Sequence, residues 1–466
     1  MNKRQKNAID SYFDMHRQEL LEDVKRLVRI PSDRGETQPD APFGPGPKAA
    51  LMEGLALCQE KGFATKNYDN YVVTADMGPE EPGLDILAHL DVVPVADNWT
   101  VCKPFEPVEQ DGKLYGRGCV DDKGPAVAAL WAMACVKALD VPLNKRVRLI
   151  LGSDEECGSG DIIHYYDKNP EAPMTVSPDG EFPILNVEKG MYRGTVHVPM
   201  SGDSGILSVT SGTKLNVVPE SAEAVLEGEK AQEIAPYVRM IARETDTTFA
   251  IHESEGKTHI LCTGQSAHAA MPEGGNNALT ALLAALGNLP LQGEDLKMMQ
   301  AASWLFPHGD YYGMALGVNQ EDEISGPLTL SLNMCKTVAG ELQLQFDCRC
   351  PVCATRENLA ETAMAAAASV GITIDDTPMF PPHIVPGDSD FVKTLLGCYE
   401  TWTGQPGKCL YTGGGTYVHF MERGVAFGPC MPGIDYHLHG PDEFIRVEDL
   451  LNMGKIYAQA ILELCG

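Results

Sequence analysis

Residues 116–124 read Gly-Arg-Gly-Cys-Val-Asp-Asp-Lys-Gly, and this glycine-rich turn organises the pattern of the whole chain. Two adjacent carboxylates, Asp121 and Asp122, lie in the turn directly before an apolar run over Ala126–Leu139 that is typical of a helix. Carboxylates in such a turn are held in place rather than freely solvated. The pattern therefore predicts that residues 116–124 form part of a functional site.

Two more acidic clusters follow apolar segments that are typical of buried strands. The segment Leu84–Leu90 contains His89 near its end and precedes Asp91, and the segment Val147–Leu151 precedes Asp154, Glu155 and Glu156. Because α/β proteins build sites at strand ends, we expect these groups to lie together. Imidazole and carboxylate ligands hold zinc, manganese or cobalt without any sulfur ligand, so the set indicates a divalent-cation site. Ordinary loop acids are the alternative interpretation.

Length and charge narrow the classes of function. With 466 residues, the chain is long enough for two domains or for one domain with a large insertion. Its 65 acidic residues exceed its 36 lysines and arginines, and the formal net charge of −29 would repel nucleic acid and anionic membranes. We therefore expect neither a nucleic acid nor a membrane as a partner.

The N-terminal segment and the cysteines indicate a cytoplasmic protein. Residues 7–30 carry apolar side chains at helical spacing with charges between them, which predicts one amphipathic helix rather than a signal sequence. The 14 cysteines are scattered through a long chain in apolar or mixed surroundings. We therefore expect reduced thiols rather than a disulfide framework.

The order of the predicted elements indicates an interrupted α/β domain. Strand-like and helix-like segments alternate over residues 71–151, which predicts a sheet with helices on its faces. From about Val187 strand-like segments dominate, as in an α+β insertion, and the α/β pattern returns after Asp388. We therefore predict a catalytic domain in two parts, residues 1–186 and 383–466, interrupted by an inserted domain of residues 187–382.

Two local patterns within the insertion are specific enough to predict single elements. The alternating runs Leu328–Met334 and Leu342–Phe346 flank Val338-Ala339-Gly340, which predicts a β-hairpin. The alanine-rich segment Arg356–Val370 ends at Gly371, which predicts a helix with a glycine cap.

Motifs of competing chemistries are missing or incomplete. The chain has no His-Glu-x-x-His helix motif and no Gly-x-Ser-x-Gly nucleophile elbow. The pair Gly116-x-Gly118 resembles the start of a dinucleotide loop, but Asp121 replaces the third glycine and would repel a pyrophosphate. The turn Gly413–Thr416 lacks the lysine of a phosphate-binding loop. These absences favour metal-dependent hydrolysis.

The motifs taken together resemble those of a known metallopeptidase family. They are His89-x-Asp91, Gly116–Gly124, Glu155-Glu156, Ser177-Pro178-Asp179, Gly264-x-Ser266-Ala267-His268 with Pro272, and His439-x-x-Asp442-Glu443. At these residues the chain resembles the family that contains carboxypeptidase G, aminoacylase and succinyl-diaminopimelate desuccinylase, and most of all its dipeptidase V branch. Many members have asparagine where this chain has Asp442. The resemblance implies a mixed-sheet α/β catalytic domain with helices on both faces, interrupted by an inserted α+β lid domain.

The same resemblance implies a site with two divalent metal ions per chain, with zinc expected and manganese or cobalt as alternatives. Asp121 would bridge the metals, His89 and Asp179 would complete one, and Glu156 and His439 the other. Asp91 would orient the ring of His89. Glu155 would take a proton from a metal-bridging water and pass it to the leaving amine.

Residues of the lid domain are expected to act on the substrate. The resemblance implies that His268 donates to the oxyanion and that Asn216 and Arg349 hold the substrate. Gly414 and Gly415 could offer backbone N–H groups to the same carboxylate as Arg349. A cap for Asn216, an ion pair for Arg349 and a tight turn for the glycines are the structural alternatives.

The expected function is that of a metal-dependent dipeptidase acting on dipeptides with a free N-terminus. An N-acyl amino acid deacylase would use the same metal site, and a non-catalytic peptide-binding descendant is a second alternative. The retained Glu155 favours an enzyme over the binding protein. The resemblance to the dipeptidase V branch implies an enlarged lid that supplies every site residue within one chain, and residues 187–382 are long enough for two lid lobes. We therefore expect a monomer with His268 acting within its own chain.

Overall fold

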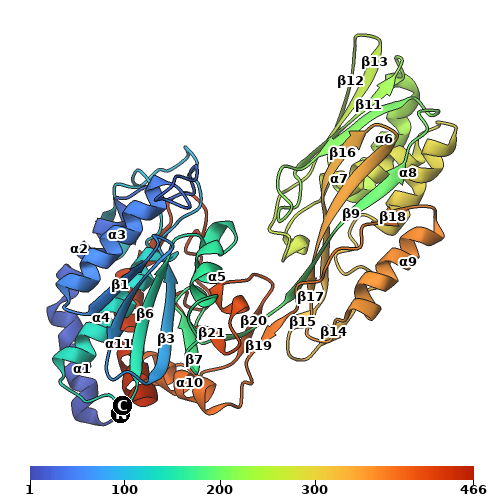
Figure 1. The fold of residues 1–466 in the computed structure, drawn as a ribbon. Helices are drawn as coiled ribbons and strands as arrows, with labels where there is room; N and C mark the ends of the chain where they lie inside the picture. Colours follow the sequence, from blue (N-terminus) through green and yellow to red (C-terminus); the bar gives the residue numbers. More distant parts are fainter. The chain divides into compact units, whose positions relative to one another are not determined.

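The computed structural model describes residues 1–466, which divide into two compact units (Figure 1). The first unit comprises residues 1–187, 383–410 and 415–466, and the second comprises residues 188–382 and 411–414. The chain therefore leaves the first unit and returns to it, so the second unit is an insertion. None of the helices is both long enough and apolar enough to cross a membrane.

The first unit is built on a mixed sheet of nine strands. Across the sheet the order is β1 (Ala64–Tyr68), β2 (Val72–Met77), β6 (Arg146–Gly152), β3 (Pro82–His89), β7 (Met174–Ser177), β21 (Gly424–Ala426), β8 (Leu185–Glu188) and β19 (His383–Ile384), with β20 (Leu410–Thr412) paired to β8. Strand β3 runs parallel to both neighbours, β6 and β7, whereas β1 and β2 are antiparallel. The parallel centre places three strand ends at one edge.

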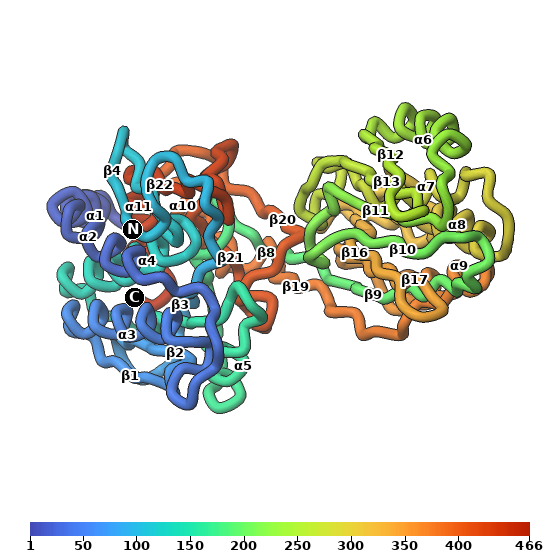
Figure 2. Tube along the Cα trace, turned by 90° about the horizontal axis from the view of Figure 1, so that it is seen from above, coloured from blue at the N-terminus to red at the C-terminus, as the bar shows by residue number.

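Helices cover both faces of this sheet (Figures 1 and 2). Along β3, Ile86 and Ala88 belong to the main apolar core, whereas Leu87 between them packs in a smaller cluster on the other face. The main core contains residues of α1 (Lys3–Met15), α2 (Arg17–Val28), α3 (Pro45–Glu60), α4 (Lys123–Ala138), α10 (Asp390–Thr403) and α11 (Val447–Cys465), and the smaller cluster contains residues of α5 (Gly160–Tyr166). The predicted α/β class with helices on both faces is confirmed.

The N-terminal segment corrects one prediction. The single amphipathic helix expected over residues 7–30 is two helices, because His16 interrupts it with φ −100° and ψ 12°. The ring of His16 packs against the rings of Tyr12 and Trp131, with centroids 4.5 and 5.4 Å away. This tertiary contact overrides the continuous helical periodicity of the sequence.

The second unit contains an eight-stranded antiparallel sheet. The order is β12 (Thr248–Ser254), β13 (Lys257–Thr263), β11 (Ser221–Glu227), β10 (Ile206–Ser211), β16 (Thr329–Val338), β17 (Glu341–Cys350), β9 (Gly190–Pro199) and β18 (Thr373–Ile374). Strands β16 and β17 form the predicted hairpin, closed by Ala339 and by Gly340 at φ 81°. The hairpin is confirmed, and its strands are longer than the alternating runs that predicted it.

One face of the second sheet carries the apolar core of this unit. Along β17, Leu344, Phe346 and Cys348 are buried in that core, whereas Asp347 and Arg349 point to the other face. The core is completed by α6 (Ala231–Thr245), α7 (Ala278–Asn288), α8 (Glu294–Leu305) and α9 (Thr362–Ser369), the last preceded by a π-helical turn over Arg356–Glu361. The opposite face is therefore left for polar side chains.

Candidate metal centre

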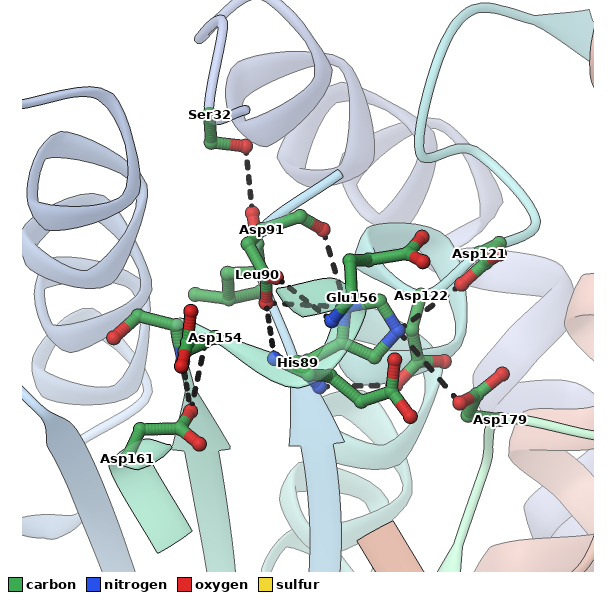
Figure 3. A network of polar contacts seen from close by, with 12 residues as sticks. Ser32, His89, Leu90, Asp91, Asp121, Asp122, Asp154, Glu156, Asp161 and Asp179 are labelled. Carbon is green, nitrogen blue, oxygen red and sulfur yellow. Dashed lines mark hydrogen bonds and ion pairs between the residues drawn. The ribbon is translucent and has the colours of Figure 1, made fainter. Parts of the chain in front are cut away.

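The centre lies where three neighbouring strands of the first unit end. His89 is the last residue of β3 and pairs with Gly152, the last residue of β6. Strand β7 ends at Ser177, two residues before Asp179. Because the three strands are parallel neighbours, their carboxyl ends meet at one edge of the sheet. Figure 3 shows the acidic side chains gathered around His89 at this edge.

Asp121 lies between two histidines. One carboxylate oxygen, Oδ1, is 3.0 Å from Nε2 of His89, and the other, Oδ2, is 2.9 Å from Nε2 of His439. Asp121 is held there by the glycine-rich turn that leads into α4. A carboxylate whose two oxygens face different imidazole nitrogens has the arrangement of a ligand shared by two metals.

Glu156 and Asp179 complete two groups of donors around Asp121. Oε1 of Glu156 lies 3.3 Å from Nε2 of His439, and Oδ2 of Asp179 lies 3.7 Å from Nε2 of His89. After Asp121, the next acid near Nε2 of His89 is thus Asp179, and the next acid near Nε2 of His439 is Glu156. Each group offers one imidazole and one carboxylate besides the shared Asp121.

Asp91 fixes the orientation of three neighbours. Nδ1 of His89, the ring nitrogen that points away from Asp121, lies 3.1 Å from the backbone carbonyl oxygen of Asp91 and 3.4 Å from its Oδ1. The two carboxylate oxygens of Asp91 also accept hydrogen bonds from the backbone N–H groups of Glu155 and Glu156, both at 3.1 Å. An oxygen that accepts the N–H of the second ring nitrogen, whether from a backbone carbonyl or a carboxylate, fixes the tautomer of a metal-binding histidine. Asp91 therefore couples the ring of His89 to the turn that carries both glutamates.

Glu155 lies close to two of the candidate ligands, His89 and Asp179. Ligand atoms of His89, Glu155 and Asp179 all lie within 4.8 Å of one another, as do those of His89, Asp121 and Glu156. The geometry alone therefore leaves two roles open for Glu155, a metal ligand and a general base.

The electrostatics of the cluster suit cations. Burial and the charge of Asp179 raise the pKa of Glu155 well above its usual range, and burial and the charge of Asp121 raise the pKa of Asp179 to about 7. Burial opposes ionisation of Asp121 as well, but hydrogen bonds with His439 and His89 outweigh it and lower its pKa. So many acids in one buried place repel one another unless positive charge compensates them. The donor set thus fits hard or borderline divalent cations.

An ion pair joins the two chain segments that supply Asp121 and His439. Strands β5 (Lys113–Tyr115) and β22 (Phe444–Arg446) pair, and the buried Arg117 contacts the buried Glu443 at 2.5 Å. The Glu443 carboxylate also accepts the N–H groups of Gly118 and Val120, at 3.0 and 3.1 Å. Arg117 in turn donates to the carbonyl oxygen of His439 at 3.1 Å. These contacts fix the two ligand loops to each other.

Asp442, where the chain departs from the usual asparagine, has a local structural role. Its carboxylate accepts hydrogen bonds from the backbone N–H groups of Thr100 and Val101, at 2.8 and 2.9 Å. These contacts fasten the loop after His439 to another loop of the first unit.

The sequence analysis did not identify Asp161 and Tyr417, a pair of residues that supports the turn carrying Glu155 and Glu156. The buried Asp161 accepts hydrogen bonds from the N–H groups of Ser153 and Asp154, the latter at 3.0 Å, and from the hydroxyl of Tyr417. Asp161 lies at the start of α5, a few residues after Glu155 and Glu156, and this position was the only local sign of its role. The contact with Tyr417, 256 residues away, has no local signal.

In the second unit, the loops of Asn216 and His268 pair with each other. The N–H of Ala269 donates to the carbonyl oxygen of Asn216 at 2.9 Å, and Val217 forms a bridge with His268. Nδ1 of His268 accepts the N–H of Ala270 at 3.1 Å. These contacts leave Nε2 as the protonated ring nitrogen in the neutral imidazole.

Arg349 is almost fully buried beside the turn that carries the predicted glycines. It pairs with Asp347 through Nε at 2.5 Å and Nη2 at 3.2 Å, and its Nη1 donates to the carbonyl oxygen of Gly413 at 2.6 Å. The N–H of Gly414 donates to Oγ1 of Thr412 at 3.0 Å, so this group is already engaged within the turn. Gly415 belongs to the first unit.

Comparisons with known proteins show which family the chain belongs to. A family model described as Peptidase family M20/M25/M40 matches residues 86–463. The "Putative dipeptidase YtjP" of Bacillus subtilis (strain 168) is 36% identical over 456 residues, which cover 96% of this chain and 97% of the relative. The "Beta-Ala-Xaa dipeptidase" of Lactobacillus delbrueckii subsp. lactis is 32% identical over 454 residues, 96% of each chain.

A solved structure supports the fold. Human carnosine dipeptidase 1 matches with a TM-score of 0.60 and covers 99% of each chain at 17% sequence identity. At this identity the likeness concerns the fold alone. Because the family model spans most of the chain and two sequence relatives match it nearly end to end, the protein belongs to peptidase family M20/M25/M40 and is a peptide-bond hydrolase.

Proposed function

We propose that the protein is a metal-dependent dipeptidase that hydrolyses dipeptides with a free N-terminus. The observation that carries the proposal is the arrangement of Asp121, whose two oxygens lie 3.0 and 2.9 Å from nitrogens of His89 and His439. The dipeptidase names of both sequence relatives support this choice of substrate within the family.

Two divalent cations per chain would fit the donors. His89 and Asp179 would hold one cation, Glu156 and His439 would hold the other, and Asp121 would bridge them. The mixture of imidazole and carboxylate ligands favours zinc, with manganese or cobalt as alternatives. When bound, the cations would act as Lewis acids that polarise the scissile carbonyl and lower the pKa of a water molecule.

Glu155 would move the proton during hydrolysis. Its carboxylate would accept a proton from the attacking water and deliver it to the nitrogen of the leaving amine. Asp91 supports this assignment, because it holds the backbone of Glu155 and the ring of His89 at the same time. One carboxylate thereby holds both the ring of His89 and the backbone from which the Glu155 side chain extends.

Residues of the inserted domain, taken as residues 187–382, would bind the substrate and the developing charge. We assign residues 1–186 and 383–466 to the catalytic domain. His268 would donate from Nε2 to the oxyanion, a role supported by the hydrogen bond that its Nδ1 already accepts. Asn216 would hold the substrate near the same group.

Arg349 would bind the substrate carboxylate. Three of its five N–H groups are used by Asp347 and Gly413, so two remain for the ligand. Its partners also fix the plane of the guanidinium before the substrate arrives, which reduces the entropy cost of binding. The turn with Gly414 and Gly415 would lie beside the same carboxylate.

A substrate panel tests the proposal. The purified enzyme, loaded with zinc or manganese, is assayed for product release from dipeptides, tripeptides and N-acetyl amino acids. Preferential cleavage of dipeptides is expected. Preferential cleavage of N-acetyl amino acids would identify a deacylase, and metal binding without any turnover would identify a peptide-binding descendant.

The cellular setting is a separate part of the proposal. We place the protein in the cytoplasm as a monomer. Ten of its 14 cysteines are buried as free thiols and pack as small apolar side chains, an arrangement that suits a reducing compartment.

A further inference from the structure

Strand β16 of the second unit contains a bulge at a central position of the sheet. Leu332 pairs with Phe346 and Met334 pairs with Gln345, so Asn333 is one extra residue on this strand. Asn333 is fully buried. Bulges redirect a side chain out of the regular ladder and are common beside active sites. A buried amide at such a place needs hydrogen-bond partners.

The side chain of Asn333 fastens the loop that carries Asn216. Its Nδ2 donates to the carbonyl oxygen of Leu215 at 2.5 Å, and its Oδ1 accepts the hydroxyl of Ser331. The same loop passes the bulge at Gly212, where φ is +75° and an added Cβ would lie 1.9 Å from the carbonyl oxygen of Asn333. Only glycine permits this approach. The loop that carries Asn216 is therefore held against the bulge by a hydrogen bond and by the close packing of Gly212.

The loop that carries His268 is fastened to the same bulge. Asn277 follows that loop, and its Nδ2 donates to the carbonyl oxygen of Leu332 at 2.8 Å. Between the two anchors, Val218 donates to the carbonyl oxygen of Ala267 at 2.9 Å, which continues the pairing of the two loops described above. Both loops thus take their position from adjacent residues of one rigid strand.

We propose that Asn333 is a positioning residue that sets the placement of Asn216 and His268 through the bulge of β16. The inference rests on the substrate-binding roles proposed for those two residues. A group that stabilises an oxyanion must be held within a fraction of an ångström, and a misplacement of about 1 Å can cost roughly a hundredfold in rate. A side chain that never touches the substrate can therefore control turnover.

Two variants separate positioning from simple loss of packing. Asn333→Asp keeps the size of the side chain but places an oxygen against the carbonyl oxygen of Leu215, and Asn333→Ala removes both hydrogen bonds. Asn169→Ala is the matched control, since Nδ2 of Asn169 also donates to a backbone carbonyl oxygen, that of Tyr165 at 2.8 Å, but lies in the first unit.

The activity measurement is a double-mutant cycle on the metal-loaded enzyme, with the best substrate of the panel. Each Asn333 variant is expected to lower kcat by about tenfold to a hundredfold with unchanged metal content. In the His268→Ala background the same change should cost less than in the wild-type background, because one of the two groups that Asn333 positions is already gone and only the misplacement of Asn216 remains. An equal loss in both backgrounds would overturn the proposal.

Hydrogen exchange supplies a readout that does not depend on catalysis. In Asn333→Ala, the amides of Val218 and Ala269 are expected to exchange at least about tenfold faster, while amides of α6 and α8 are unchanged. Unchanged protection at Val218 and Ala269 would overturn the role of the bulge. Failure of the wild-type enzyme to cleave any dipeptide would instead overturn the proposed function, and the exchange result would still decide the role of Asn333.

Discussion

Oδ2 of Asp121 lies 2.9 Å from Nε2 of His439, although the two residues are 318 positions apart in the chain. The intervening sequence includes the whole inserted unit. The metal centre is therefore completed only when the C-terminal part of the first unit folds back onto the strand ends near His89. The shared ligand, the general base and the contacts that hold the two loops can therefore each be tested by a separate variant.

The shared ligand should affect both cations. We expect Asp121→Ala to lower the zinc content from two ions per chain towards none, because each oxygen of Asp121 serves one donor group. The measurement is elemental analysis after equilibration at a fixed free zinc concentration. A variant that retains both ions and full activity would exclude the bridging role.

Glu155 should be needed for turnover but not for metal binding. We expect Glu155→Ala to retain both cations while kcat falls by roughly two to four orders of magnitude, the usual contribution of a general base. Parallel metal analysis and steady-state kinetics check this prediction. Loss of a cation would instead identify Glu155 as a ligand, the second role that its distance from His89 and Asp179 allows.

The Arg117–Glu443 pair should couple stability to metal affinity. We expect Arg117→Met to destabilise the fold by about 3–5 kcal/mol, because Glu443 would be left buried without its partner. Zinc affinity should also fall, since Arg117 holds the backbone of His439. Urea unfolding and calorimetric zinc titration measure the two effects.

A matched arginine gives the control for that experiment. Arg148 pairs with Asp76 at 2.6 Å between β6 and β2, and its other side-chain hydrogen bond goes to the hydroxyl of Tyr165 in α5. Arg148→Met should change stability without changing zinc affinity. Equal zinc affinities in the Arg117 and Arg148 variants would contradict a role of Arg117 in holding His439.

The sequence predicted those parts of the centre that have a local signature. His89 is the last residue of one apolar strand, Glu155 follows another, and Asp121 lies in a glycine-rich turn before a helix, so each could be found from a short window of residues. The hairpin of β16 and β17 was likewise visible as two alternating runs. Periodicity and turn chemistry are properties of neighbouring residues, and they predict elements and strand ends well.

Long-range contacts could not be predicted in the same way. The pairing of Arg117 with Glu443 spans 326 residues, and nothing in either segment specifies the other. The sequence around Asn333 reads as a regular strand, yet the structure has a bulge there. The bulge depends on the close approach of Gly212, which is distant in the sequence. The break at His16 similarly depends on Trp131. Each of these features is set by tertiary packing, which overrides local propensity.

The oligomeric state can be tested through complementation. We expect a monomer in which His268 acts on the centre of its own chain, so mixing inactive His268→Ala chains with inactive Glu155→Ala chains should restore no activity. Sedimentation at several concentrations provides the control for association. Recovered activity in the mixture would show that subunits share His268 and would contradict the prediction.

The two ends of the substrate should matter separately. If Arg349 binds the C-terminal carboxylate, converting that group to an amide should cost about 1.5–3 kcal/mol of transition-state stabilisation, the value of a hydrogen bond to a charged group. The cost should appear in kcat/KM for a dipeptide and its amide, and it should shrink in Arg349→Met, whose remaining partner Asp347 still pairs with Arg193 at 2.8 Å. Acetylating the free amine should also lower kcat/KM, because an N-acetyl amino acid keeps the carboxylate and lacks the ammonium. An N-acetyl amino acid cleaved as fast as the best dipeptide would contradict the dipeptidase assignment and favour the deacylase, since the carboxylate contact alone would then account for recognition.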